Sequence, residues 1–384
     1  MNMQFPARPW GASLLAAMLA LCAAMSASGA QDDSILGGLK HIRVVASTVP
    51  ATGDVNPYGM AQVQYTVGKL RSGHILVSNF NNASNAQGTG TTIVDIAPDG
   101  TQSLFAALDA AALPGPCPGG VGLTTALVVL NEGWVIVGSL PTSDGTAATA
   151  QAGCLIVLDS MGKPVETFFG SLINGPWDMT VVELAGEAKL FITNVLNGTV
   201  AANGQVVNQG SVVRVDLALA VGRMPALAAL TVIGSGFAER TDPAALVIGP
   251  TGVALSAACG EYDEYCAQHL QLYVADTLKN RITAIPQPLD RTTTAGTGAT
   301  FSGGGSLNAP LGLISVAEDG HLLTVNGADG FITEINREGV QVAKTLIDST
   351  GSPPGAGALF GLVFDPAHGI YFVDDATNTL NLLH

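Results

Sequence analysis

Short stretches of alternating apolar and polar residues recur along the chain, and they predict strands rather than helices. A clear example runs from Leu270 to Asp276, where Leu272 and Val274 alternate with Gln271 and Tyr273. A period of two places successive side chains on opposite faces of a strand. We therefore expect an all-β fold built from short strands.

The strands fall into a unit that recurs six times. Each unit enters its first apolar strand near a Gly, often with a Pro beside it, because Pro fixes φ and Gly permits a steep entry. Tight turns such as Pro98-Asp99-Gly100 connect the outer strands as hairpins. The second strands end 48 to 82 residues apart, at Asn79, Ser139, Asn194, Asp276, Asn326 and Asp374. Four-stranded units at such spacing predict a six-bladed β-propeller.

The two ends of the chain supply complementary strands. The last unit has Tyr371–Asp374 and Asn378–Leu383 but lacks a fourth strand, whereas Lys40–Ala46 alternates without a hairpin partner nearby. Pairing Lys40–Ala46 with the last blade would close the ring and remove an exposed edge. In the longest spacing, the Ala- and Leu-rich stretch Leu217–Leu230 predicts a short helix.

The first thirty residues have the pattern of a secretory signal peptide. Arg8 provides a positive charge, Leu14–Ala24 is apolar but too short to span a bilayer, and Ser28-Gly29-Ala30 offers small residues for cleavage. We expect a signal peptide over residues 1–30 and one propeller domain over residues 31–384. The protein would then be exported to the periplasm or the extracellular space.

Composition narrows the expected partners. The net charge is −15, and only 12% of the 384 residues are charged. This balance argues against nucleic acid or anionic lipid as a partner. Beyond the leader, no stretch is apolar enough for a membrane span. We expect a monomer that binds a protein partner or a small-molecule ligand.

Four cysteines remain beyond the leader, an even number that favours disulfides in an exported protein. Cys259 and Cys266 bracket a short acidic loop, so local pairing is the simplest interpretation. Cys117 and Cys154 would then form the second pair. The spacing lacks the CxxC pattern of zinc or redox motifs.

Two segments resemble the NHL repeat. They are Leu272–Thr277 with Asn280–Ile282, and Tyr371–Asp375 with Asn378. This resemblance implies a propeller and leaves the activity open, since NHL-type propellers include binding platforms, sensors and a few enzymes. The related gluconolactonase-type and paraoxonase-type propellers imply a catalytic metal at the channel mouth, held by Glu, Asn and Asp. We find no counterpart here for the Glu.

The second-strand ends carry the candidate metal ligands. They should share one face of the ring, and carboxylate and amide oxygens are hard ligands that suit Ca²⁺. The alternative is that each one caps its own turn by accepting backbone N–H groups, and repetition across blades favours this role. The candidate ligands are Asn79, Asn194, Asp276, Asn326 and Asp374.

Four further residues are expected near the same rim and are candidates for ligand binding: Tyr58, Trp177, Asp178 and Phe360. Trp177-Asp178 replaces the Gly of the repeat, and it either forms an aromatic platform or fills the space left by the Gly. The sequence contains no HExxH, GxSxG or P-loop motif, and we assign no catalytic residue. We therefore favour a binding protein, with a Ca²⁺-dependent lactonase or esterase-type hydrolase as the alternative.

Overall fold

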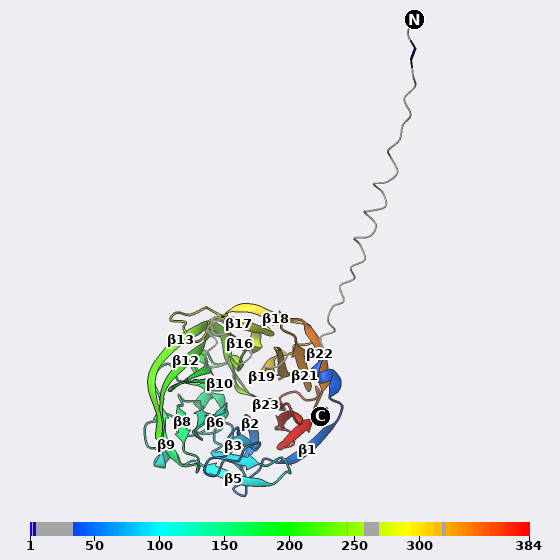
Figure 1. Ribbon diagram of the computed structural model, residues 1–384. Coiled ribbons are helices and arrows are strands. Elements are labelled where there is room, and N and C mark those ends of the chain that lie inside the picture. The colour runs from blue at the N-terminus through cyan, green and yellow to red at the C-terminus, as the bar shows by residue number, and fades with distance from the viewer. Residues whose placement is uncertain (2, 5–33, 244, 257–268, 317–319) are drawn as a thin grey trace. The chain divides into compact units, whose positions relative to one another are not determined.

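Six antiparallel sheets surround a common centre (Figure 1), which confirms the predicted propeller. The computed structural model describes residues 1, 3–4, 34–243, 245–256, 269–316 and 320–384. The chain divides into two units, Met1–Asp33 and Ser34–His384. All described strands belong to the second unit.

The first three blades follow one another along the chain. Blade 1 consists of β2 (Val55–Gln62), β3 (Ile75–Asn81), β4 (Thr92–Ile96) and β5 (Gln102–Ala107). Blade 2 consists of β6 (Leu123–Val129), β7 (Val135–Ser139), β8 (Leu155–Leu158) and β9 (Pro164–Phe168). Blade 3 has five strands, β10 (Pro176–Leu184), β11 (Glu187–Asn194), β12 (Val207–Ala220), β13 (Arg223–Asp242) and β14 (Leu246–Ile248).

The remaining three blades complete the ring. Blade 4 consists of β15 (Pro250–Leu255), β16 (Gln271–Asp276), β17 (Arg281–Pro286) and β18 (Ala299–Gly303). Blade 5 consists of β19 (Pro310–Val316), β20 (His321–Asn326), β21 (Phe331–Ile335) and β22 (Gln341–Leu346). Blade 6 consists of β23 (Leu359–Asp365), β24 (Gly369–Asp374), β25 (Thr379–Leu383) and β1 (Ile42–Ser47).

Among the residues that the structure describes, helical structure is confined to short connections. These are α1 (Ile35–Gly38), α2 (Thr199–Ala202) and three 3₁₀ turns, η1 (Ala110–Ala112), η2 (Ala147–Thr149) and η3 (Thr277–Lys279). Among the described residues, no helix is long and apolar enough to cross a membrane.

Each first strand packs against the first strands of both neighbouring blades, so these six strands line the centre. Glycine residues in the first strands permit the backbones of neighbouring blades to approach closely. A Cβ atom on Gly312 would collide with the carbonyl oxygen of Phe360 in the next blade, and one on Gly59 with those of Thr124 and Thr125. The recurring glycine of the sequence unit is therefore a requirement of blade-to-blade packing.

The N-terminal strand closes the ring, as the sequence predicted. β1 pairs antiparallel with β25, with Ile42 opposite Leu383 and Ser47 opposite Thr379. The backbone N–H groups of Lys40 and His41 also donate to the carbonyl oxygen of His384, at 2.9 and 2.8 Å. Blade 6 thus takes its outermost strand from the beginning of the folded unit.

A second contact fixes the segment before β1 to blade 5. The carboxylate of Glu334 accepts hydrogen bonds from Ser34 Oγ at 2.7 Å and from the backbone N–H groups of Ile35 and Leu36 at 2.9 and 3.0 Å. Its Oε1 atom is also hydrogen-bonded with His321 Nδ1 at 2.6 Å, and Glu334 and His321 are both fully buried. The carboxylate therefore caps the first turn of α1.

Blade 3 corrects one prediction. Leu217–Leu230 forms parts of β12 and β13, not a helix. The side chains of Leu217, Ala218 and Leu219 are buried, exposed and partly buried in turn, which is the period of a strand. β12 pairs with β11 on one edge and with β13 on the other, and these ladders override the helical propensity of Ala and Leu.

One predicted disulfide is present. Cys117 and Cys154 are bonded, with 5.1 Å between their Cα atoms, and they connect the loop before β6 to the start of β8. The proposed Cys259–Cys266 pair lies outside the part of the chain that the structure describes.

We predict that Leu36→Ala lowers the free energy of unfolding by about 2–4 kcal/mol, because it empties a core position. The Leu36 side chain is only 2% exposed. Ile42→Ala, in β1 but 44% exposed, is the matched control and should cost less than about 1 kcal/mol. Urea unfolding of both variants tests this, and equal small losses would show that the segment before β1 is not docked.

Candidate functional site

The site predicted from the sequence lies where the first strands begin, and we call this end of the central channel the mouth. In five blades the first residue of the first strand pairs with the last residue of the second strand, and in blade 1 the equivalent pair lies two residues inside both strand ends. The pairs are Pro57–Asn79, Leu123–Ser139, Pro176–Asn194, Pro250–Asp276, Pro310–Asn326 and Leu359–Asp374. The two positions of each pair therefore lie at the same end of their blade.

Each first strand has a register shift directly after this pair. Such irregularities are common beside functional sites, where they re-aim a side chain. The residues within the shifts include all four predicted ligand-binding residues, Tyr58, Trp177, Asp178 and Phe360.

The structure brings these three aromatic residues together. The ring of Tyr58 is stacked on that of Phe360, with 3.8 Å between centroids, and on that of Phe80 at 4.6 Å. The Trp177 ring lies 6.4 Å from Phe360. Exposure is only 3% for Tyr58, 4% for Trp177 and 2% for Phe360, so the rings form a closed aromatic cluster rather than an open platform.

Polar groups surround Tyr58. Burial raises its pKa well above the usual value, the Asp375 carboxylate raises it further, and a hydrogen bond with the Asn56 side chain lowers it. Tyr58 therefore keeps its proton at all ordinary pH values and can donate a hydrogen bond. Asn56 is only 8% exposed, and its Oδ1 atom has no hydrogen-bond partner among the described residues.

Asp178 lies apart from the aromatic cluster, at the interface of blades 3 and 4. Its Oδ2 atom accepts a hydrogen bond from the backbone N–H of Val253 at 3.1 Å. Burial raises the pKa of Asp178 to about 7, although hydrogen bonds from the backbone N–H groups of Met179 and Val253 oppose the shift. The equivalent position in four other blades is glycine: Gly59, Gly252, Gly312 and Gly361.

Two further acids near the mouth were not identified from the sequence. Burial, together with the charges of Asp374 and Asp348, raises the pKa of Asp375 to about 7. Burial raises the pKa of Glu239 to about 8, against hydrogen bonds from the side chain and backbone of Asn197. These acids are partly protonated near neutral pH, so they can donate as well as accept.

The side chains of Asn79 and Asn194 bond to nearby segments. Asn79 Nδ2 donates to the carbonyl oxygen of Thr48 at 3.0 Å and to Thr92 Oγ1 at 3.2 Å. Asn194 Oδ1 accepts from the backbone N–H of Gly175 at 3.3 Å. Both contacts hold the loops that lead into or flank a blade.

Asn326 and Asp374 act similarly. Asn326 Nδ2 donates to the carbonyl oxygen of Ser306 at 3.0 Å and to Asp329 Oδ1 at 2.9 Å. Asp374 Oδ1 accepts from the backbone N–H of Thr377 at 3.2 Å. Each side chain satisfies groups of its own blade, as turn capping requires.

Asp276 has a charged partner. Its Oδ2 atom pairs with the guanidinium of Arg281 at 2.8 Å, while burial raises the pKa of Asp276. Asp276 Oδ1 and Asn79 Oδ1 have no hydrogen-bond partner in the described part of the chain. Within the described residues, no three His, Cys, Asp or Glu side chains are grouped to hold a metal ion. The donor set thus fits turn capping better than one shared metal centre.

Asp242, at the end of β13, and Pro243, which follows it, lie close to blade 1. The Gln87 side chain of blade 1 donates to the carbonyl oxygen of Pro243 at 3.5 Å. Asp242 lies close enough to Tyr58 to raise its pKa. Leu246 is 1% exposed, has φ of 60°, and belongs to the same buried cluster as Trp177. A bulky residue with positive φ is rare and marks a position held by its surroundings.

Three of the residues near the mouth that the sequence analysis did not select lie close in sequence to residues that it did select. Asp375 directly follows the repeat-borne Asp374, Phe80 follows Asn79, and Asn56 precedes Pro57. Asp375 and Phe80 are each one position from a predicted site residue, and Asn56 is two positions from Tyr58. Glu239 carries no such signal, because it reaches the mouth through the long, non-repeating strand β13.

The fold defines this protein as a six-bladed β-propeller. No family model matches the chain, so its resemblance to the NHL repeat remains a prediction. No curated protein matches its sequence.

Solved structures with similar folds include a gluconolactonase from Xanthomonas campestris, at 14% identity and a TM-score of 0.53 over 89% of this chain and 88% of that one. Another is the calcium-binding protein regucalcin from Agrobacterium tumefaciens, at 13% identity and a TM-score of 0.51 over 88% and 92%. A luciferin-regenerating enzyme has 10% identity and a TM-score of 0.53 over 89% and 94%. Similarity at this level shows the fold alone.

We predict that Asp178→Asn removes a pH-dependent destabilisation. With a folded-state pKa of about 7 and an unfolded value near 3.8, Asp178 holds its proton only in the folded state between these pH values, so it weakens folding as pH rises. The variant should exceed the parent in unfolding free energy by about 1–3 kcal/mol at pH 8 and match it near pH 4.

Asp144→Asn is the matched control. Hydrogen bonds from Thr149 and Thr146 lower the pKa of Asp144, so this change should cost stability above pH 4 instead. Urea unfolding at both pH values compares the three proteins. A pH-independent difference for Asp178→Asn would contradict the assignment.

Proposed function

We propose that this protein binds a small ligand at the mouth of its central channel. The observation that carries the proposal is the convergence of Tyr58, Trp177 and Phe360 from three different blades. Concave sites with apolar walls and a few polar groups are typical of small-molecule binding. Here Asn56 Oδ1, the Tyr58 hydroxyl and the Asp375 carboxyl would supply the polar groups.

Burial of the rings favours a small molecule over a protein partner. A protein surface lying across the mouth would meet the residues that cover the rings, since the rings themselves are 2–4% exposed. A small ligand would instead need only the polar edge of the cluster, at Asn56 and the partly exposed Asp375. Aromatic rings offer a large contact area with little loss of side-chain freedom.

A second function, hydrolysis of a lactone or ester, rests on a different observation. Asp178 and Asp375 both have a pKa of about 7, which is the range in which a carboxyl group works as a general acid or base at neutral pH. The metal ion that the resemblance implies does not fit here, because no three acidic, His or Cys side chains of the described residues are grouped to hold it. The partnerless Asp276 Oδ1 and Asn79 Oδ1 belong to blades 4 and 1, which are not neighbours in the ring, so we assign no step to Ca²⁺.

A thermal-shift titration with glucono-δ-lactone and dihydrocoumarin tests ligand binding. We expect at least one of them to raise the melting temperature of the full chain, and Trp177→Ala to weaken that binding about tenfold or more, because an aromatic contact is lost. Trp134→Ala is the control, since Trp134 lies outside the mouth, on blade 2. Equal binding by both variants, or a flat titration with both compounds, would count against the proposal.

An experiment on calcium content distinguishes a binding protein from a hydrolase. We expect Asp276→Ala to lower the free energy of unfolding by about 2–4 kcal/mol, because it leaves the partly buried Arg281 without its partner. If the site only caps a turn, the calcium content after dialysis stays unchanged. Bound calcium that disappears with Asp276→Ala, together with lactone turnover in a pH-stat that is lost in the variant, would establish the hydrolase instead.

A further inference from the structure

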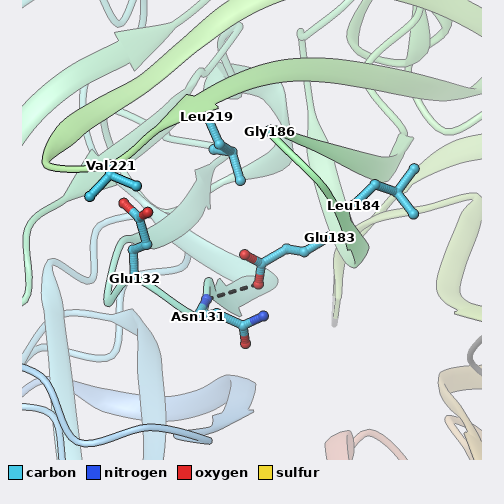
Figure 2. A pocket seen from close by; sticks show the side chains of 7 residues that line it. All are labelled: Asn131, Glu132, Glu183, Leu184, Gly186, Leu219 and Val221. Carbon is cyan, nitrogen blue, oxygen red and sulfur yellow. Dashed lines mark hydrogen bonds between the residues drawn. The ribbon is translucent and has the colours of Figure 1, made fainter. Parts of the chain in front are cut away.

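A pocket of about 310 Å³ lies at the end of the propeller opposite the mouth, between blades 2 and 3 (Figure 2). Blade 2 contributes the turn between β6 and β7, and blade 3 contributes two turns, those between β10 and β11 and between β12 and β13. The lining residues are Asn131, Glu132, Glu183, Leu184, Gly186, Leu219 and Val221.

Two carboxylates, one from each blade, line this pocket. Glu183 is held in place because its Oε1 atom accepts the backbone N–H of Asn131 at 2.8 Å (Figure 2). Burial raises the pKa of Glu183, and the like charge of Glu132 raises it further. Because none of the seven lining residues carries a positive charge, the repulsion between the two carboxylates is not offset within the pocket.

Two basic residues of blade 3 pair with other acids, and no ion pair with Glu183 or Glu132 is recorded for Arg223, which lies two residues after the pocket's Val221. Lys189 lies 3.5 Å from Glu187 and 3.4 Å from Asp216. Arg214 pairs with Asp216 at 2.8 Å. Glu187, three residues after the pocket's Leu184, thus has an internal counter-ion, which the structure does not record for Glu183 or Glu132.

The rest of the wall is aliphatic. Leu219 and Val221 lie beside the two carboxylates, and Leu184 also lines the pocket but points away from them (Figure 2). Val221 is 91% exposed, an unusual position for a branched apolar side chain. Acidic and aliphatic surfaces therefore lie side by side in one concavity.

We propose that this pocket binds a small aliphatic ammonium ion. The carboxylates would accept charge-assisted hydrogen bonds from the ammonium group, and the aliphatic wall would cover its methylene groups. A bare metal ion suits the pocket less well, because Ca²⁺ needs six to eight oxygen ligands and no three acidic, His or Cys side chains of the described chain are grouped to supply them. This pocket is separate from the mouth, so a test of ammonium binding here does not depend on whether a ligand binds at the mouth.

Titration calorimetry of the full chain with n-butylammonium chloride tests the proposal, with n-butanol as the neutral analogue of equal length. We expect binding of the ammonium compound and at least tenfold weaker binding of the alcohol. Glu183→Gln should weaken ammonium binding about three- to tenfold, as the loss of one ionic partner does. Glu338→Gln, which makes the same charge change in an exposed turn of blade 5, should have no effect.

Val221→Ser tests the aliphatic wall without threatening the fold, because Val221 is exposed. It should weaken n-butylammonium but not methylammonium, which is too short to reach the wall. The proposal is overturned if the alcohol binds as well as the amine, or if Glu183→Gln and Glu338→Gln behave alike. Calcium chloride that competes with the amine at equal concentration would also overturn it, since the site would then select charge alone.

Discussion

The pairing of β1 with β25 is the constraint on which the rest of the structure depends. Tyr58 belongs to blade 1 and Phe360 to blade 6, and their rings lie 3.8 Å apart only because closure places these two blades side by side. The charge of Asp375, which raises the pKa of Tyr58, lies near it for the same reason. The aromatic cluster and its nearby acids are thus products of a long-range backbone ladder, supported by Glu334 where it caps α1.

Much of this architecture could be predicted because it is repeated. Alternation, turn glycines and second-strand ends are local features, and six copies of each reinforce one another, so the blade count and the closing strand were recognised correctly. Leu217–Leu230 occurs once and has no such support. Its Ala and Leu residues favour a helix locally, and only the ladders with β11 and along β13 make it a strand.

In the candidate site too, the repeated features were predictable from the sequence and those that depend on distant segments were not. Tyr58, Trp177 and Phe360 were found together because they share one position of the repeat. The pKa values of Asp375 and Glu239 could not be read from the sequence, because they depend on burial by segments that are distant along the chain. Asp178 was noticed as an exception to the repeat, but its bond to Val253 of the next blade required the structure.

The order of synthesis gives the closing contact a further consequence. The ribosome makes Ser34 and β1 some 300 or more residues before their partners, Glu334 and β25. The nascent chain must therefore carry an unsatisfied strand edge while the blades between them are made. Blades can form one by one behind it, but the ring becomes a closed body only after β25 has emerged. Stalled or prematurely terminated chains would lack this closure, which makes them natural targets for chaperones and proteases.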